Sequence, residues 1–180
     1  MLTILPYIWF MLPIYFANMA PVFVKDYFNK LAIPIDLGKK INNKRIFGNN
    51  KTYRGIILGI IFSIIIISFQ KELYSIKFIK SISLVNYINI NLILWGFLMG
   101  FGALFGDLAG SFIKRRLDIK PGKSLILLDQ LDFIAGGLFF ISFVYKLNIK
   151  MIIIILPISF ILTILVNHTS YYLKMREVKW

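Results

Sequence analysis

Five long apolar runs separated by short polar segments constrain this chain more than any other feature. They cover residues 2–24, 53–69, 92–113, 124–145 and 151–173. A helix needs roughly 17–25 apolar residues to cross a bilayer, and each run reaches that length. Because only helices and closed barrels satisfy their backbone groups in lipid, the pattern predicts an all-α polytopic membrane protein. We expect one membrane domain, residues 1–180, with about five transmembrane helices.

The basic residues predict the orientation of this domain. Of the 21 Lys and Arg residues, sixteen lie in segments 25–54 and 114–123 and in the tail beyond 173, and five lie in the other connections. Cytoplasmic loops carry the excess of Lys and Arg. We therefore expect a multi-pass protein of the cell membrane with an outside N-terminus, a cytoplasmic C-terminus and cytoplasmic loops at 25–52 and 114–123. Topology also explains the net charge of +13, so we expect no nucleic-acid partner.

The first run contains three prolines, Pro6, Pro13 and Pro21. A proline inside a helix cannot donate to the carbonyl four residues earlier. In lipid the freed carbonyls need partners, so we expect polar groups from neighbouring helices, or water, to contact this run.

Three carboxylates lie in otherwise apolar surroundings: Asp107 in the third run, and Asp129 and Asp132 in the fourth. A carboxylate at the centre of a spanning helix costs at least ~2.5–3.5 kcal/mol, so it needs a partner, water or a metal. Carboxylate oxygens suit Mg²⁺, which commonly takes one or two of them together with substrate phosphates. We expect the three to hold a metal in an active site on the cytoplasmic side. Plain salt bridges to Arg115 or Arg116 remain the alternative.

Other polar residues surround these carboxylates. Ser111 and Lys114 share a helix face with Asp107, because offsets of three and four residues lie on one side of a helix. Arg115 and Arg116 follow directly. An adjacent stripe of small residues, Gly102, Gly106 and Gly110, would let another helix approach closely. The stretch 102–133 therefore predicts a site for a metal-bound polyanion.

A second polar cluster, GNNKTYRG at residues 48–55, precedes the second run. Backbone N–H groups at a helix N-terminus favour an anion, and Lys51 and Arg54 add positive charge there. Thr52 lies between them. Basic residues beside a span often only set topology, so both interpretations stay open for this cluster.

These residues together resemble a known family. YFANMAPV (15–22), PIDLGKK (34–40), GNNKTYRG (48–55), GDLAGSFIKRR (106–116) and LDQLDF (128–133) are similar, in the same order and with similar spacing, to motifs of archaeal CDP-archaeol synthases. The resemblance runs from the first span to the fourth. It implies a helical membrane enzyme related to CDP-diacylglycerol synthases that needs Mg²⁺ and transfers CMP from CTP to an ether-lipid phosphate.

The resemblance also implies roles for individual residues. Asp107, Asp129 and Asp132 would bind the metal and, with Lys114, form the catalytic set. Two groups would bind substrate: Ser111, Arg115 and Arg116 at phosphates, and Asn18, Asp36, Lys51, Thr52 and Arg54 at the nucleotide. The expected partners are CTP, an isoprenoid ether-lipid phosphate whose tails lie between helices, and the bilayer.

Three other classes of protein fit the sequence less well. A non-catalytic membrane subunit would explain the spans but not the charged residues. A CDP-alcohol phosphotransferase would need D-x-x-D-G-x-x-A-R, but Phe133 follows Asp132. An ion- or proton-coupled transporter could use the intramembrane carboxylates as relay groups. Transporter sites lie near the midplane of the membrane, whereas these carboxylates lie toward one face.

Overall fold

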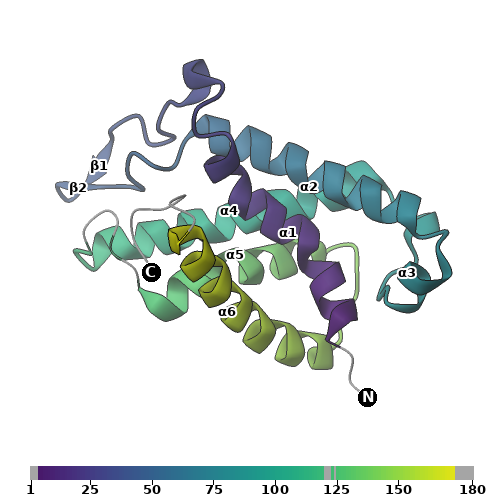
Figure 1. Ribbon diagram of the computed structural model, residues 1–180. Helices are drawn as coiled ribbons and strands as arrows, with labels where there is room; N and C mark the ends of the chain where they lie inside the picture. The colour runs from purple at the N-terminus through teal and green to yellow at the C-terminus, as the bar shows by residue number, and fades with distance from the viewer. Residues whose placement is uncertain (1–3, 120–122, 124, 173–180) are drawn as a thin grey trace.

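The computed structural model describes residues 4–119, 123 and 125–172, and in this part of the chain the protein is helical (Figure 1). Its helices are α1 (Leu5–Phe23), α2 (Tyr53–Leu73), α3 (Lys77–Ser81), α4 (Leu92–Arg116), α5 (Ile126–Ile141) and α6 (Ile149–Tyr172). The 3₁₀ turns η1 (Asn29–Leu31) and η2 (Tyr87–Asn89) and the strands β1 (Lys40–Ile41) and β2 (Lys44–Arg45) complete the described elements. The predicted all-α fold with about five long helices is confirmed.

Within the described residues, four helices are long and apolar enough to cross a membrane: α1, α2, α4 and residues Ile149–Thr169 of α6. The fifth, α5, has 16 residues and is shorter than the predicted run 124–145. Parts of the predictions, residues 2 and 3, 120–122, 124 and the tail from 173, lie outside the described residues.

The two polar ends of the helix bundle differ in structure (Figure 1). The start of α1 and the short α3 lie at one end, and the β1–β2 hairpin lies at the other, beside the last turns of α4. We call the latter the hairpin end. Asn42 and Asn43 form the turn of the hairpin with positive φ values of 49° and 61°, which asparagine tolerates better than most residues.

The predicted glycine stripe joins α4 to α5. A Cβ on Gly102 would lie 2.6 Å from the carbonyl oxygen of Gly136, and one on Gly106 would overlap the carbonyl oxygen of Asp132. The two backbones are therefore in direct contact, as small residues allow in membrane helices. This contact brings the carboxylates of the two helices to one interface.

A carbonyl freed by a proline of α1 has a partner, as expected. Pro13 cannot donate to the carbonyl of Trp9, and Gln70 Nε2 of α2 donates to that oxygen at 2.5 Å. The hydroxyl of Tyr87 donates to Gln70 Oε1 at 3.3 Å. Gln70 is buried and satisfied at both ends of its amide, so it joins α1, α2 and η2 far from the hairpin end.

Candidate functional site

An ion pair joins the two polar clusters expected from the sequence. Lys51, just before α2, places its Nζ 2.5 Å from Asp107 Oδ2 on α4. The two side chains are about one quarter exposed, 25% and 27%. The cluster at residues 48–55 therefore does more than flank a span, because its lysine reaches a carboxylate of the neighbouring helix.

A second ion pair joins α4 to the start of α5. Lys114 Nζ lies 2.5 Å from Asp129 Oδ1. Asp129 Oδ2 accepts a hydrogen bond from the backbone N–H of Leu125 at 3.1 Å, in the first turn of α5. A carboxylate in the first turn of a helix also interacts favourably with the helix dipole. Lys114, and not the predicted Arg115 or Arg116, is therefore the ion-pair partner of Asp129.

Asp132 differs from both of these carboxylates. It lies one turn further along α5, and its Oδ1 accepts a hydrogen bond from the N–H of Phe133 at 2.6 Å. Its other oxygen lies against Gly110 of α4. Among the described residues no cation pairs with Asp132, although Asp107, Lys51 and Asp129 are close enough to act on its charge. The interface thus combines three carboxylates with two lysines.

The donor set at this interface suits a hard divalent cation. All three candidate ligands are carboxylates, the ligand type that Mg²⁺ prefers, and Asp132 carries no cationic partner in the described part of the chain. The geometry is not that of an assembled metal site, because no group of three or more such side chains among the described residues is placed to hold one ion together. Lys51 and Lys114 instead neutralise two of the carboxylates.

Asp36 organises the loop that carries Lys51. Its buried carboxylate accepts hydrogen bonds from Arg45 at 2.6 Å (Nη2) and 3.2 Å (Nε), and from the backbone N–H groups of Gly38, Phe47 and Gly48. Burial raises the pKa of Asp36, but these hydrogen bonds outweigh burial and hold the pKa well below its usual value. Asp36 was predicted to bind substrate. In the structure its hydrogen bonds hold the loop together.

The three arginines predicted to bind substrate donate to backbone carbonyls. Arg116 contacts the carbonyls of Ile41, Lys44 and Arg45 at 2.7–3.1 Å and so holds the hairpin against α4. Arg54 donates to the carbonyls of Lys25 and Tyr27, and Arg115 donates to that of Ile119. Because a guanidinium has five N–H donors, these contacts leave capacity for a ligand.

The remaining predicted residues have varied surroundings. Thr52 is the N-cap of α2, and its Oγ1 accepts from the N–H of Gly55 at 3.2 Å. Ser111 is buried on α4, and Asn18 is half-buried on α1. Neither Ser111 nor Asn18 makes a side-chain hydrogen bond within the described residues. Both are therefore available to a ligand.

Two polar residues were missed from the sequence. Arg45 is the main partner of Asp36 and also donates to Asn49 Oδ1 at 2.9 Å. Gln130 lies between Asp129 and Asp132 and is 1% exposed, and its Oε1 has no hydrogen-bond partner in the described structure. The position of Gln130 within LDQLDF was the only signal for it, since burial cannot be read from the sequence.

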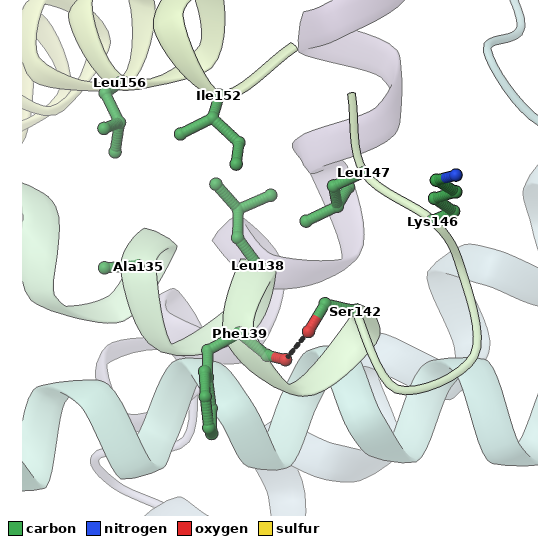
Figure 2. A pocket seen from close by; sticks show the side chains of 8 residues that line it. All are labelled: Ala135, Leu138, Phe139, Ser142, Lys146, Leu147, Ile152 and Leu156. Carbon is green, nitrogen blue, oxygen red and sulfur yellow. Dashed lines mark hydrogen bonds between the residues drawn. The ribbon is translucent and has the colours of Figure 1, made fainter. Parts of the chain in front are cut away.

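Apolar cavities lie between α5 and α6. One, of about 520 Å³, is lined by Leu138 of α5 and by Ile152 and Leu156 of α6, whose side chains point toward one another (Figure 2). A second, of about 300 Å³, is lined by Leu127, Leu131, Leu156, Pro157, Phe160 and Ile161. Leu127 and Leu131, which line the second cavity, lie at the level of Asp129 along α5 but on a different face of the helix.

The chain is similar to known proteins over nearly its whole length. Residues 1–180 match the family model described as CarS-like: CDP-archaeol synthase. The CDP-archaeol synthase of Methanocaldococcus jannaschii is 37% identical over 174 residues, which cover 96% of this chain and 95% of that protein. The corresponding protein of Methanococcus maripaludis is 40% identical and covers 96% and 94%. A solved structure of an intramembrane enzyme for archaeal membrane lipids biosynthesis superimposes with a TM-score of 0.73 at 29% identity, and covers 92% of this chain and 94% of that one.

Proposed function

The chain belongs to the CDP-archaeol synthase family, and we propose how the residues of its charged interface carry out the reaction of that family. The protein is an intramembrane, CTP-dependent cytidylyltransferase of archaeal lipid biosynthesis. It transfers CMP from CTP to an ether-lipid phosphate, giving CDP-archaeol and pyrophosphate. The whole chain acts as one membrane domain in this proposal.

The observation that carries the proposal is the ion pair between Lys51 and Asp107. It joins a cation beside a helix N-terminus, suited to phosphates, to a carboxylate interface suited to a metal. CTP with Mg²⁺ presents both a polyanion and a divalent cation, so it matches both halves of this pair. In the proposal Lys51 and Lys114 leave their carboxylates for phosphate oxygens when the nucleotide binds.

Asp107, Asp129 and Asp132 would then hold Mg²⁺. When bound, the metal would neutralise the charge that develops on the triphosphate during transfer. Ser111, Arg115 and Arg116 would contact phosphates. Asn18, Thr52 and Arg54 would hold the nucleotide, and Asp36 would support them by fixing the loop through Arg45.

The acceptor needs no general base. The second pKa of a phosphate monoester is near ~6, so a lipid phosphate is largely dianionic at pH 7. One of its oxygens attacks the α-phosphorus of CTP, a new P–O bond forms, and the bond to the β-phosphate breaks to release pyrophosphate. The lysines and arginines of the site would offset the repulsion between the two polyanions and align them.

The isoprenoid tails would lie in the apolar cavities between α5 and α6, with the phosphate at the carboxylate interface. The second of these cavities is lined by Leu127 and Leu131 of α5, which lie at the level of Asp129 along the helix. In this arrangement the hairpin end faces the cytoplasm, where CTP is available, and the N-terminus lies outside. The excess of positive charge in the loops of the hairpin end supports that orientation.

Incorporation of labelled CTP into lipid tests the proposed reaction. The purified protein in detergent or liposomes should form a chloroform-soluble cytidine product only when an ether-lipid phosphate and Mg²⁺ are both supplied. One pyrophosphate should be released for each molecule of cytidine lipid formed. A protein that releases pyrophosphate without labelling lipid, or that labels lipid without Mg²⁺, would contradict the proposal.

A further inference from the structure

Gln130 is a polar side chain that neither the fold nor the proposed reaction explains. It lies on α5 between Asp129 and Asp132 and is 1% exposed. Its amide makes no hydrogen bond with any described residue, and its Oε1 is fully buried. A buried polar group without a partner is unfavourable, and most such groups in folded proteins are satisfied. A partner from outside the chain would satisfy this amide.

Gln70 shows what a structural glutamine looks like in this protein. It is equally buried, at 1% exposure. Its Nε2 donates to the carbonyl of Trp9 at 2.5 Å, and its Oε1 accepts from the hydroxyl of Tyr87 at 3.3 Å. The amide of Gln70 is thus used at both ends, whereas the buried Oε1 of Gln130 has no partner among the described residues.

The position of Gln130 on α5 indicates which regions of the protein lie beside it. Successive residues of an α-helix are about 100° apart, so Gln130 lies between Asp129 on one side and Leu127 on the other. Asp132 lies beyond Asp129, against α4. Leu127 and Leu131 line the apolar cavity beside α6. Gln130 therefore occupies the part of the helix surface between the charged interface and the apolar cavity.

We propose that Gln130 positions the lipid acceptor by hydrogen-bonding its neutral glycerol segment. This inference rests on the proposed function, in which the phosphate lies at the carboxylates and the tails lie between α5 and α6. The glycerol unit with its ether oxygens is the part of the lipid that joins these two regions. The terminal torsion of glutamine is broad and roughly two-fold, so the amide can turn its NH₂ toward an ether oxygen. An uncharged amide also suits an uncharged polar segment.

The test compares two acceptors and three variants. The acceptors are a di-geranylgeranyl glycerol phosphate and geranylgeranyl phosphate, which has the phosphate and the isoprenoid but lacks glycerol. Gln130→Met keeps the length of the side chain and removes its hydrogen-bonding groups. Gln70→Met is the matched control. Gln130→Asn, which retains a shorter amide, provides a conservative variant should Gln130→Met fail to fold.

We expect Gln130→Met to lower kcat/KM for the glycerol lipid about 3- to 10-fold, the size expected for one neutral hydrogen bond. The preference over geranylgeranyl phosphate should fall by the same factor, with KM for CTP unchanged. The thermal midpoint should not fall, because no described residue hydrogen-bonds the lost group. Gln130→Asn should retain part of the preference. Gln70→Met should lower the thermal midpoint and leave the acceptor preference intact.

Two results would overturn the inference while leaving the proposed function in place. One is an unchanged acceptor preference in an active Gln130→Met or Gln130→Asn protein. The other is a loss of stability in Gln130→Met comparable to that of Gln70→Met, with both acceptors affected equally. Failure of the parent protein to label either lipid would instead contradict the proposed function itself.

Discussion

Gly110 of α4 lies directly against the carboxylate of Asp132 on α5, and a Cβ at position 110 would overlap Asp132 Oδ2. The glycine stripe therefore does more than let two helices approach. It leaves space for a carboxylate inside the interface, where Asp107 and Lys51 are close enough to act on its charge. The position of Asp132 depends on the absence of a single side-chain atom on the neighbouring helix.

Substituting this glycine should separate activity from folding. We expect Gly110→Ala to displace the Asp132 carboxylate and to lower CDP-lipid formation at least tenfold, because small misplacements of reacting groups are costly. Ala109, exposed on the same helix, provides the control: Ala109→Ser should retain activity. Both variants should be extracted as folded protein. Full activity in Gly110→Ala would show that the position of Asp132 does not matter.

Lys51 should matter for CTP in particular. If its ammonium moves from Asp107 to a phosphate, Lys51→Ala should lower kcat/KM for CTP about ten- to a hundredfold, from the loss of a charge-assisted contact worth about 1.5–3 kcal/mol. Lys39 is exposed in the same loop and has no described ion pair, so Lys39→Ala is the matched control. Equal CTP kinetics in both variants would leave Lys51 with a role in topology only.

The ionised carboxylate of Asp36 should stabilise the loop that carries Lys51 throughout the range from pH 5 to 8. Its folded pKa is held below the unfolded value, so its contribution to stability is present above the unfolded pKa and is lost only as pH falls through the folded pKa. Between pH 5 and 8 the parent should therefore show no activity change from this group. Asp36→Asn should release Arg45 and speed trypsin cleavage after Lys39 and Lys40. The exposed Asp26→Asn is the control, and equal cleavage of both variants would contradict this role.

Orientation can be measured on a protein that has no native cysteine. Lys40 in the hairpin and Ser81 at the end of α3 are exposed and lie at opposite ends of the bundle. Single cysteines at these positions should react with a membrane-impermeant maleimide from opposite sides of sealed vesicles, with position 40 on the cytoplasmic side. Labelling of both from one side would exclude the proposed topology.

The sequence predicted the helices well because apolar length is a local property. It placed the ends less well: α2 continues to Leu73 and α4 to Arg116, past the predicted ends at 69 and 113. An apolar run ends at its first charged residue. The helix itself can continue, because its backbone stays hydrogen-bonded and long basic side chains reach the membrane–water interface. The break after Ile141 of α5 had no strong turn signal in the sequence.

Part of the candidate site could also be predicted, because spacing along a single helix is a local property. Spacing along one helix placed Asp107 with Lys114, and Asp129 with Asp132, on common faces. It could not predict that Lys114 pairs with Asp129, or that Arg116 holds the hairpin, because these contacts depend on how separate segments fold together. The burial of Asp36 and Gln130 was missed because it also depends on how separate segments pack together.

Thermal unfolding of purified Asp132→Asn, with and without CTP and Mg²⁺, shows whether this carboxylate belongs to a metal site. Asparagine keeps the shape of the side chain but removes a charge that no described cation neutralises. Without ligand, the variant should unfold at the same or a higher temperature than the parent, because an unpaired carboxylate in a membrane helix is costly. The stabilisation by CTP with Mg²⁺ seen in the parent should largely disappear, and CDP-lipid formation should be lost. A variant that unfolds earlier, beside a parent in which Mg²⁺ has no effect, would show that Asp132 is structural and would contradict the metal-site proposal.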